Sequence, residues 1–494
     1  MRLFAATKQL STAFQLSLIS PLFFIGAELL AQTPRTLVFD ATKFTTQSQE
    51  IDGKAVAVRV YEKIIYVANP VDTVYEIMNI YIPEAYFNEG TINGYTAKTA
   101  PIFFPNKVGG YMPAQPATFL SQPQRGGMPG GSQNISVATA LSKGYIVASA
   151  GARGRTTVNA QKEFTGKAPA GLVDLKAAVR YLKFNDALMP GDANKIISNG
   201  TSAGGAMSTL LGATGNHPDY EPYLQALGAA KATDNIFAVS AYCPITNLDH
   251  ADMAYEWQLN KIHGYKFRGK EGELDAEAIK VSDELKAAFP SYLNSLNLRD
   301  EAGKKLSLDT EGNGNFKEYL KKQLIASAQK ALATGIDVSK HTFFKIENGK
   351  VLSVDFDGYM TYLERMKTPP AFDALDSQSF ENNLFGTATT ANQHFTAYSF
   401  KNSKDTSPKM ADAKQVKMMN PMNYLGVKNA KTATYWRIRH GAKDKDTGFA
   451  IPLILATALQ NKGFSVDFAL PWGKPHSGDY DLDELFDWAD KICK

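Results

Sequence analysis

The chain has 494 residues, of which 44% are hydrophobic and 21% are charged. This composition is typical of a globular protein with one large core and a second domain or insertion, and it argues against a disordered chain. The 53 basic and 49 acidic residues leave a formal charge of +4, which is too balanced for nucleic-acid binding, so we expect a small-molecule partner.

The N-terminal end differs from the rest of the chain. Arg2 and Lys8 precede the mostly apolar stretch AFQLSLISPLFFIGAELLA, and a polar segment follows it. This order is typical of a secretory signal peptide, whereas Pro21, Glu28 and the lack of a stop-transfer pattern disfavour a membrane span. We therefore predict that residues 1–31 are a signal peptide for a secreted or periplasmic protein, with no span left after cleavage.

Short strand-like runs begin near residue 36 and then give way to alternating strands and helices. The runs TLVFD, AVAVRVYEKIIYV, YEIMNIYIP and APIFFP are rich in β-branched and aromatic residues. Further on, a buried strand is predicted at 144–151, an amphipathic helix at 171–184 and another strand at 237–244. This alternation indicates a mostly parallel sheet with helices on both faces.

Between these elements, the stretch NGTSAGGAM places Ser202 in the pattern Gly200-x-Ser202-x-Gly204. The pattern alone is weak evidence, but the apolar pair Ile196-Ile197 precedes it and a small, then apolar, helix-like run follows it. A nucleophilic serine on a sharp turn between a strand and a helix needs small neighbours, because the two elements approach closely. The context therefore favours a nucleophile over an idle serine in a flexible turn.

The character of the chain changes again between about residues 246 and 405, where long helical and polar stretches predict an inserted, mainly helical lid domain. The alternation of strands and helices then resumes. We therefore predict a core domain of residues 32–245 and 406–494 and a lid of residues 246–405. Such a lid is one way to build a covered, water-poor site above the strand ends. In the lid, helices are predicted at 277–296 and 314–334. In the later part of the core, strands are predicted at 432–441 and 464–471 and helices at 451–463 and 482–493.

Two loops near the C-terminus hold an acid and a histidine. Asp444 and Asp446 follow one predicted strand, and His476 lies on a Gly/Pro-rich loop after the next. The chain order serine, acid, histidine, with each residue on a loop after a strand, is that of the α/β-hydrolase triad. A serine hydroxyl needs an imidazole to take its proton, and a carboxylate to orient that imidazole. Because Asp444 has the common spacing after His440-Gly441, we predict the triad Ser202, Asp444 and His476.

The negative oxygen that forms during ester attack needs two backbone N–H donors. Ala203, directly after the serine, offers one, and the loop NKVGGYMP offers the other at Gly109 or Gly110, of which Gly110 is preferred. The glycine-rich stretch RGGMPGGSQN is not followed by GK[ST], so a phosphate cradle is disfavoured.

Metal sites and disulfide frameworks have little support in the sequence. The chain has no HExxH and no paired CxxC motif, and Asp249, His250 and Asp252 in LDHAD fit a polar entrance to the lid as well as a metal site. No metal and no other cofactor is therefore predicted. The chain has two cysteines, Cys243 and Cys493, and the sequence leaves open whether they are bridged.

Several stretches together resemble the bacterial tannases, which are tannin acyl hydrolases with an α/β-hydrolase core and a large helical lid. They are PNKVGGYMP, SNGTSAGGAMSTLLGATGNHPDY, KTPPAFDALDSQSFENNLFGT, HGAKDKDTGFAIP and PWGKPHSGDYDL. The resemblance implies the triad above, and it implies that Lys367, Glu381 and Asp446 bind the three hydroxyls of a galloyl ring. From the sequence alone, without this resemblance, Lys367 and Glu381 would be interpreted as solvated charges on the surface of the lid. Thr201 and Pro475 stand where fungal tannases and feruloyl esterases carry cysteines, so the chain is not of that type.

The sequence, read with this resemblance, predicts a monomeric serine esterase that hydrolyses galloyl esters, from alkyl gallates to gallotannins and depsides, through an acyl-enzyme and releases gallic acid. An ammonium and two carboxylates around the phenols would reject an analogue without them, because buried charges would be left unpaired. An esterase for feruloyl or other acyl esters is the alternative, and it gains if the three charged residues do not converge near Ser202. A catalytically silent binding protein with this fold is disfavoured, because all three triad members are present in order.

Overall fold

A computed structural model describes residues 35–51, 53–119, 132–267 and 269–494. The predicted signal peptide and most of the glycine-rich stretch at 125–134 lie outside these residues. Residues 35–494 form one compact unit, so the division into core and lid stays a prediction. No helix of the described residues has the length and apolar character needed to cross a bilayer.

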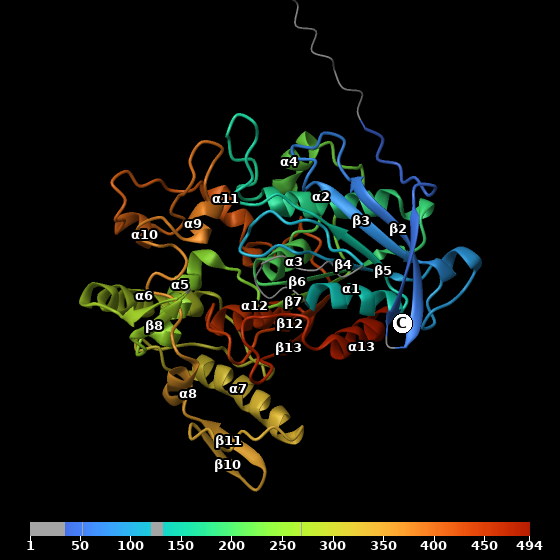
Figure 1. The fold of residues 1–494 in the computed structure, drawn as a ribbon. Coiled ribbons are helices and arrows are strands. Elements are labelled where there is room, and N and C mark those ends of the chain that lie inside the picture. The colour runs from blue at the N-terminus through green and yellow to red at the C-terminus, as the bar shows by residue number, and fades with distance from the viewer. Residues whose placement is uncertain (1–34, 52, 120–131, 268) are drawn as a thin grey trace, which may run out of the picture. The chain divides into compact units, whose positions relative to one another are not determined.

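A nine-stranded sheet forms the centre of the molecule (Figure 1). Its strands are β1 Thr45–Ile51, β2 Lys54–Ile65, β3 Ile77–Pro83, β4 Pro101–Pro105, β5 Ile146–Ala150, β6 Asp192–Thr201, β7 Ala238–Tyr242, β12 Tyr435–Arg439 and β13 Ser465–Ala469. Their spatial order is β1-β2-β3-β5-β4-β6-β7-β12-β13. The six strands from β5 to β13 in this order run parallel, and β1, β2 and β3 form an antiparallel edge.

Helices cover both faces of this sheet (Figure 1). The helices of the core part are α1 Ser132–Ser142, α2 Ala170–Phe184, α3 Ala203–Ala213, α4 Glu221–Ala226, α11 Ala413–Met418, α12 Ala450–Asn461 and α13 Leu482–Cys493, with the short turns η1 Glu84–Asn88, η2 Asp186–Leu188, η3 Pro218–Tyr220 and η4 Pro421–Asn423. α1 contacts α13, whereas α2 contacts α3. Every residue of β4, β5 and β7 is buried, as expected for central strands with helices on both sides.

One predicted strand is wrong. The run TLVFD at 36–40 lies in a loop, where Phe39 is buried and its N–H donates to Asn185 Oδ1 over 2.8 Å. The edge strand is instead β1, with the polar sequence TTQSQEI, which alternates between exposed and half-buried positions. An edge strand is held by its backbone pairing with β2, so it does not need the apolar side chains on which the prediction relied.

The segment from 246 to 405 is mainly helical, as predicted, but it also contains two small hairpins. Its elements are α5 Leu248–Leu259, α6 Ala276–Ser295, α7 Asn315–Ala333, α8 Phe356–Leu363, α9 Phe380–Leu384 and α10 Ala397–Lys401, with hairpins β8 Gly264–Phe267 to β9 Lys270–Glu273 and β10 Phe344–Glu347 to β11 Lys350–Val354. The residues between α8 and α9 form an irregular loop without helix or strand. That loop carries Lys367, and Glu381 lies just after its far end, in the first turn of α9.

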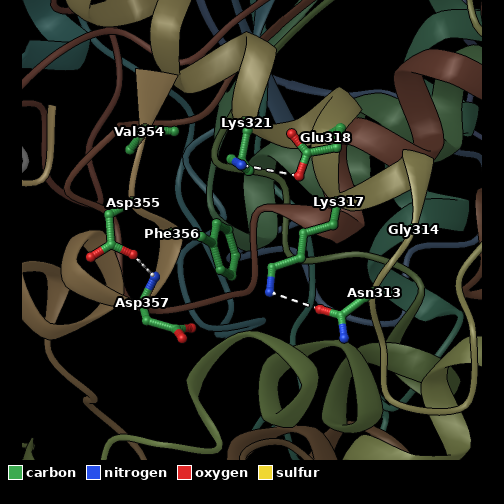
Figure 2. Close-up of a pocket in the computed structure, with 9 residues that line it drawn as sticks. All are labelled: Asn313, Gly314, Lys317, Glu318, Lys321, Val354, Asp355, Phe356 and Asp357. Atoms are coloured by element: carbon green, nitrogen blue, oxygen red, sulfur yellow. Dashed lines mark hydrogen bonds and ion pairs between the residues drawn. The ribbon is translucent and has the colours of Figure 1, made fainter. Parts of the chain in front are cut away.

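A polar pocket lies between α7 and α8 (Figure 2). Among its lining residues, Lys321 pairs with Glu318 over 3.0 Å, and Lys317 donates to Asn313 over 3.3 Å. None of the residues predicted for catalysis or substrate binding lines it. The candidate active site is therefore elsewhere, at the carboxyl ends of the parallel strands.

Candidate active site

Ser202 lies on the sharp turn between β6 and α3. Its backbone angles are φ 61° and ψ −125°, a conformation that residues with a side chain rarely adopt. The turn is held by the Ser202 N–H, which donates to the carbonyl of Tyr242 at the end of β7 over 2.9 Å. A strained serine at this position is the geometry of a nucleophile elbow.

The small residues around Ser202 are required by close contacts. A Cβ atom at Gly204 would lie 2.7 Å from the Asn106 side-chain oxygen and 2.8 Å from the carbonyl of Val108. One at Gly205 would lie 2.6 Å from the carbonyl of Tyr242. Real Cβ atoms do not approach oxygen atoms so closely. The start of α3 can therefore lie this near to the loop after β4 and to the end of β7 only with glycine at these two positions.

The predicted acid and histidine of the triad are in contact. His476 Nδ1 lies 2.7 Å from Asp444 Oδ2, and the other carboxylate oxygen of Asp444 accepts the N–H of Asp446 over 2.8 Å. Burial opposes the charge of Asp444, yet the imidazoles of His476 and His440 hold its pKa well below the usual carboxyl range. Burial also opposes the imidazolium of His476, but the carboxylate of Asp444 outweighs this and raises the pKa of His476 well above that of a free imidazole.

The loop that carries His476 packs against the elbow. A Cβ atom at Gly478 would collide with the side chain of Thr201, the residue before Ser202. Within the described residues, His476 Nε2 has no hydrogen-bond partner, so the bond to Ser202 is not formed in this structure. Catalytic hydrogen bonds of this kind are often long in the free enzyme and shorten with substrate.

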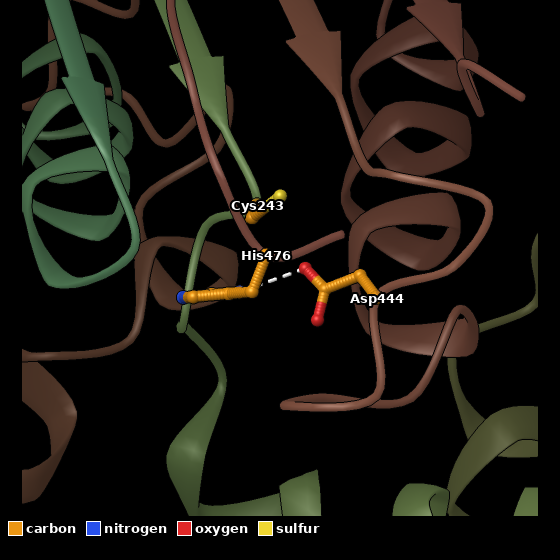
Figure 3. A group of neighbouring side chains, drawn as sticks. All are labelled: Cys243, Asp444 and His476. Carbon is orange, nitrogen blue, oxygen red and sulfur yellow. Dashed lines mark hydrogen bonds and ion pairs between the residues drawn. The ribbon is translucent and has the colours of Figure 1, made fainter. Parts of the chain in front are cut away.

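Cys243 is a third neighbour of the acid and histidine pair, and the sequence did not assign it a place (Figure 3). The possible ligand atoms of Cys243, Asp444 and His476 all lie within 4.8 Å of one another. Burial raises the pKa of the Cys243 thiol to about 11, so it stays protonated at neutral pH. Its thiol donates to the carbonyl of Ser477 over 3.4 Å, and both Cys243 and Cys493 are unbridged. Its position directly after β7, at the carboxyl edge of the sheet, was the available signal.

The LDHAD stretch does not form a group of metal-ligand type among the described residues. His250 instead stacks on Tyr292, with ring centroids 3.7 Å apart. Asp249 accepts a hydrogen bond from Asn420 over 2.7 Å. Asp252 accepts two backbone N–H groups.

The predicted oxyanion donors lie next to the elbow. Gly109 and Gly110 lie on the loop after β4, which begins at Asn106. The side-chain amide of Asn106 donates to the carbonyls of Asn199 and Gly204 over 3.2 and 3.1 Å and so ties this loop to β6 and α3. Gly110 has a φ of +54°, which favours glycine. Within the described residues, no hydrogen bond from the N–H of Ala203, Gly109 or Gly110 is found, so these amides can serve a substrate oxygen.

Arg155 joins this loop to the segment of the predicted lid and was missed by sequence reasoning. Its Nε donates to the carbonyl of Gly110 over 2.8 Å, and its Nη1 donates to Asn383 over 3.0 Å. Its guanidinium also lies over the ring of Phe380, 4.4 Å from the centroid. The position of Arg155 shortly after β5, in a GARGR sequence at the carboxyl edge of the sheet, was the only hint.

Lys367, Glu381 and Asp446 come together, and they are not solvated lid charges. Lys367 Nζ lies 2.8 Å from Asp446 Oδ1, and the Lys367 side chain is only 13% exposed. Burial disfavours the ammonium, but the charges of Asp446 and Glu381 outweigh it and raise the pKa of Lys367. Burial raises the pKa of Glu381, which is 8% exposed, and the charge of Lys367 opposes that rise.

Two of these three charges act on residues of the predicted site or next to it. The charge of Asp446 acts on His476, adding to the rise in its pKa that Asp444 causes. Tyr111 follows Gly110 directly. Its pKa is raised well above the usual value by burial and, secondarily, by the charge of Glu381. The charges of Asp446 and Glu381 therefore act on groups of the predicted site, and the role of the three residues in ring binding stays a prediction.

A mainly parallel sheet with an elbow serine and an acid and histidine pair on later loops defines an α/β-hydrolase. The family described as BD-FAE, which has this fold, matches residues 127–292. No match was found among curated proteins.

Solved structures give the particular family. The tannase of Fusobacterium nucleatum is 51% identical, with a TM-score of 0.88, covering 93% of this chain and 100% of that one. A tannin acyl hydrolase in complex with 3,4-dihydroxybenzoate is 47% identical, with a TM-score of 0.89, over 93% and 99%. A tannin acyl hydrolase in complex with ethyl gallate is 47% identical, with a TM-score of 0.88, over the same shares. The chain belongs to the bacterial tannases, which are carboxylic ester hydrolases, and the predicted fold and family are confirmed.

Proposed function

We propose that this protein hydrolyses esters of gallic acid, such as alkyl gallates and gallotannins, through a covalent galloyl-serine intermediate. The observation that carries the proposal is the largely buried group of Lys367, Asp446 and Glu381, whose charges act on His476 and on Tyr111 of the Gly110 loop. A largely buried ammonium that pairs with one carboxylate and feels the charge of a second fits a ring with neighbouring phenols better than an apolar acyl group.

In the first half of the reaction, Ser202 Oγ attacks the ester carbonyl while His476 Nε2 takes its proton. Asp444 holds the imidazole through Nδ1 and stabilises the imidazolium. The N–H groups of Ala203 and of Gly110 or Gly109 stabilise the negative oxygen of the tetrahedral intermediate. The imidazolium then protonates the leaving alcohol, and the galloyl group remains on Ser202.

In the second half, His476 activates a water molecule that attacks the galloyl ester, and gallic acid leaves. The three phenols bind Lys367, Asp446 and Glu381 throughout, so the carbonyl stays aligned with the serine. The relatives support this role, since one binds 3,4-dihydroxybenzoate and another binds ethyl gallate. The pairing of Lys367 with Asp446, and the charge of Glu381 acting on Lys367, favour this proposal over the alternative of a feruloyl-type or general carboxylesterase.

The test compares kcat/KM for methyl gallate and methyl benzoate, in the wild type and in Ser202→Ala. We expect a preference for the gallate of about a thousandfold or more, because the benzoate leaves buried charges without partners. Methyl 3,4-dihydroxybenzoate should lie between them. Ser202→Ala should abolish hydrolysis of all three esters. Equal rates on gallate and benzoate would leave a serine hydrolase standing and would overturn the galloyl assignment.

We also propose that residues 1–31 act as a signal peptide and that the mature enzyme is exported, because the basic and apolar pattern of the sequence is typical of one. N-terminal sequencing of the protein recovered from the periplasm or medium tests this. A mature protein that still begins at Met1 would contradict it.

A further inference from the structure

One face of α5 holds the segments that carry the three ring-binding charges. Tyr255 and Asp252 are three residues apart on this helix, so their side chains point the same way, and both are buried. Neither lies among the predicted triad, oxyanion or ring-binding residues. Their partners are backbone groups of the loop between α8 and α9 and of the loop that carries Asp446.

The hydroxyl of Tyr255 joins two of these segments. It accepts the N–H groups of Met366 and Lys367, each over 3.1 Å, and it donates to the carbonyl of Lys445 over 3.1 Å. Lys445 is the residue before Asp446. One oxygen atom therefore sets the distance between the backbone that carries the ammonium and the backbone that carries its carboxylate partner.

The carboxylate of Asp252 holds the same loop further along. Its two oxygens accept the N–H groups of Phe372 and Asp373 over 2.7 and 3.0 Å. The ring of Phe372 lies under Lys367, with Nζ 4.0 Å from the centroid. Asp373 in turn accepts the side-chain amide of Asn382, the residue after Glu381, over 2.7 Å. Asp252 is thus connected to both ends of the segment that carries Lys367 and Glu381.

The loop needs such contacts, because residues 364–379 form no helix or strand of their own, and only Arg365, near the start, forms a backbone bridge to strand β8. Holding it this way is costly, since burial, and then the charge of Asp373, raises the pKa of Asp252 to about 7. A carboxylate in such an environment persists only where its hydrogen bonds are well made. These features point to a positional role for the α5 face beyond general packing.

We propose that Tyr255 and Asp252 are positioning residues that set the spacing of Lys367, Asp446 and Glu381 and thereby the preference of the enzyme for hydroxylated rings. The inference rests on the proposed function. Neither residue touches the reacting atoms. Loss of either contact should therefore disturb ring recognition and leave the triad able to act on an ester whose ring makes no hydrogen bonds.

The test uses Tyr255→Phe, which removes the hydroxyl and keeps the ring. We expect the ratio of kcat/KM for methyl gallate to that for methyl benzoate to fall by about 10- to 100-fold, mainly through KM for the gallate, because small displacements of binding groups have effects of this order. The rate on methyl benzoate should stay close to that of the wild type. Tyr220→Phe is the matched control, because Tyr220 is also fully buried and its hydroxyl donates to a carbonyl in α11, that of Met418, over 2.6 Å, instead of to the segments that carry Lys367 and Asp446.

Asp252→Asn provides a second variant if Tyr255→Phe does not fold. The amide keeps one acceptor oxygen and presents an NH₂ group to the other backbone N–H, so the same fall in preference is expected. An unchanged preference in a folded variant, or an equal loss on both esters, would overturn the inference. A wild type that shows no preference for methyl gallate would instead overturn the proposed function and this inference with it, so the two failures are distinguishable.

Discussion

The backbone N–H of Asp446 donates a hydrogen bond to the side chain of Asp444 over 2.8 Å. One tight turn therefore joins the carboxylate that orients His476 to the carboxylate that pairs with Lys367. In the proposed mechanism, recognition of the ring and activation of the serine therefore share one support, so an ester whose ring is bound would have its carbonyl already placed for attack. The same relationship couples the charges of the two sites.

The pH dependence of the enzyme should show this coupling. Protonated His476 cannot accept the proton of Ser202, so kcat/KM should fall as the pH drops through the pKa of His476. Because the charge of Asp444, and to a lesser degree that of Asp446, raises this pKa, the acidic limb of the profile should lie above the value of 6.5 for a free imidazole. The profile is measured with methyl benzoate, which does not use the ring-binding charges.

The variant Asp446→Asn should move this acidic limb to lower pH, because it removes one of the charges that favour the imidazolium. Asp467→Asn serves as a control, since Asp467 also pairs with a basic residue, Arg439 over 2.7 Å, and is not among the charges that shift His476. An acidic limb that stays in place in Asp446→Asn would show that the charge of Asp446 does not act on His476.

Removal of the ammonium should affect one substrate class selectively. In Lys367→Met, the carboxylates of Asp446 and Glu381 lose their shared cation, and the phenols lose a charged donor. We expect kcat/KM for methyl gallate to fall by about 10- to 100-fold, the usual range for a hydrogen bond to a charged group. The rate on methyl benzoate should hardly change. Steady-state kinetics on both esters decide the matter, and a parallel loss on both would mean that Lys367 supports the fold and not the ring.

Loss of Arg155 should affect all substrates alike, in contrast to loss of Lys367, because Arg155 donates to the carbonyl of Gly110 and so holds the predicted oxyanion loop. In Arg155→Met, kcat should fall on methyl gallate and methyl benzoate by similar factors, up to about a hundredfold if one oxyanion donor is displaced. Arg59→Met is the matched control, since Arg59 also pairs with a polar partner, Glu84 over 2.9 Å, and lies over an aromatic ring, that of Phe87. A loss confined to the gallate would assign Arg155 to ring binding instead.

Much of the site could be predicted because its signals are local in the chain. Ser202 has small neighbours within a few residues, and Asp444 and His476 each follow a strand that hydrophobic runs reveal. Tyr255 carries no such signal, since the residue that it positions, Lys367, is 112 positions away in sequence. Arg155 and Cys243 likewise gain their meaning only from contacts that the folded chain creates. The edge strand β1 was missed for a related reason, because backbone pairing and not side-chain pattern holds it.

The close packing of α3 against the predicted oxyanion loop can be tested by adding a single methyl group to the helix. In Gly204→Ala, the added methyl group would lie 2.7 Å from the Asn106 side-chain oxygen and 2.8 Å from the carbonyl of Val108, so the loop must move away from the elbow. Overpacking of this kind costs about 1–3 kcal/mol, which should lower the melting temperature, and displacement of the loop should lower kcat on every ester. Gly109→Ala is the control for stability, because a Cβ atom there meets nothing within 4 Å. If calorimetry shows the same melting temperature for Gly204→Ala and the wild type, the loop does not pack on the helix as described.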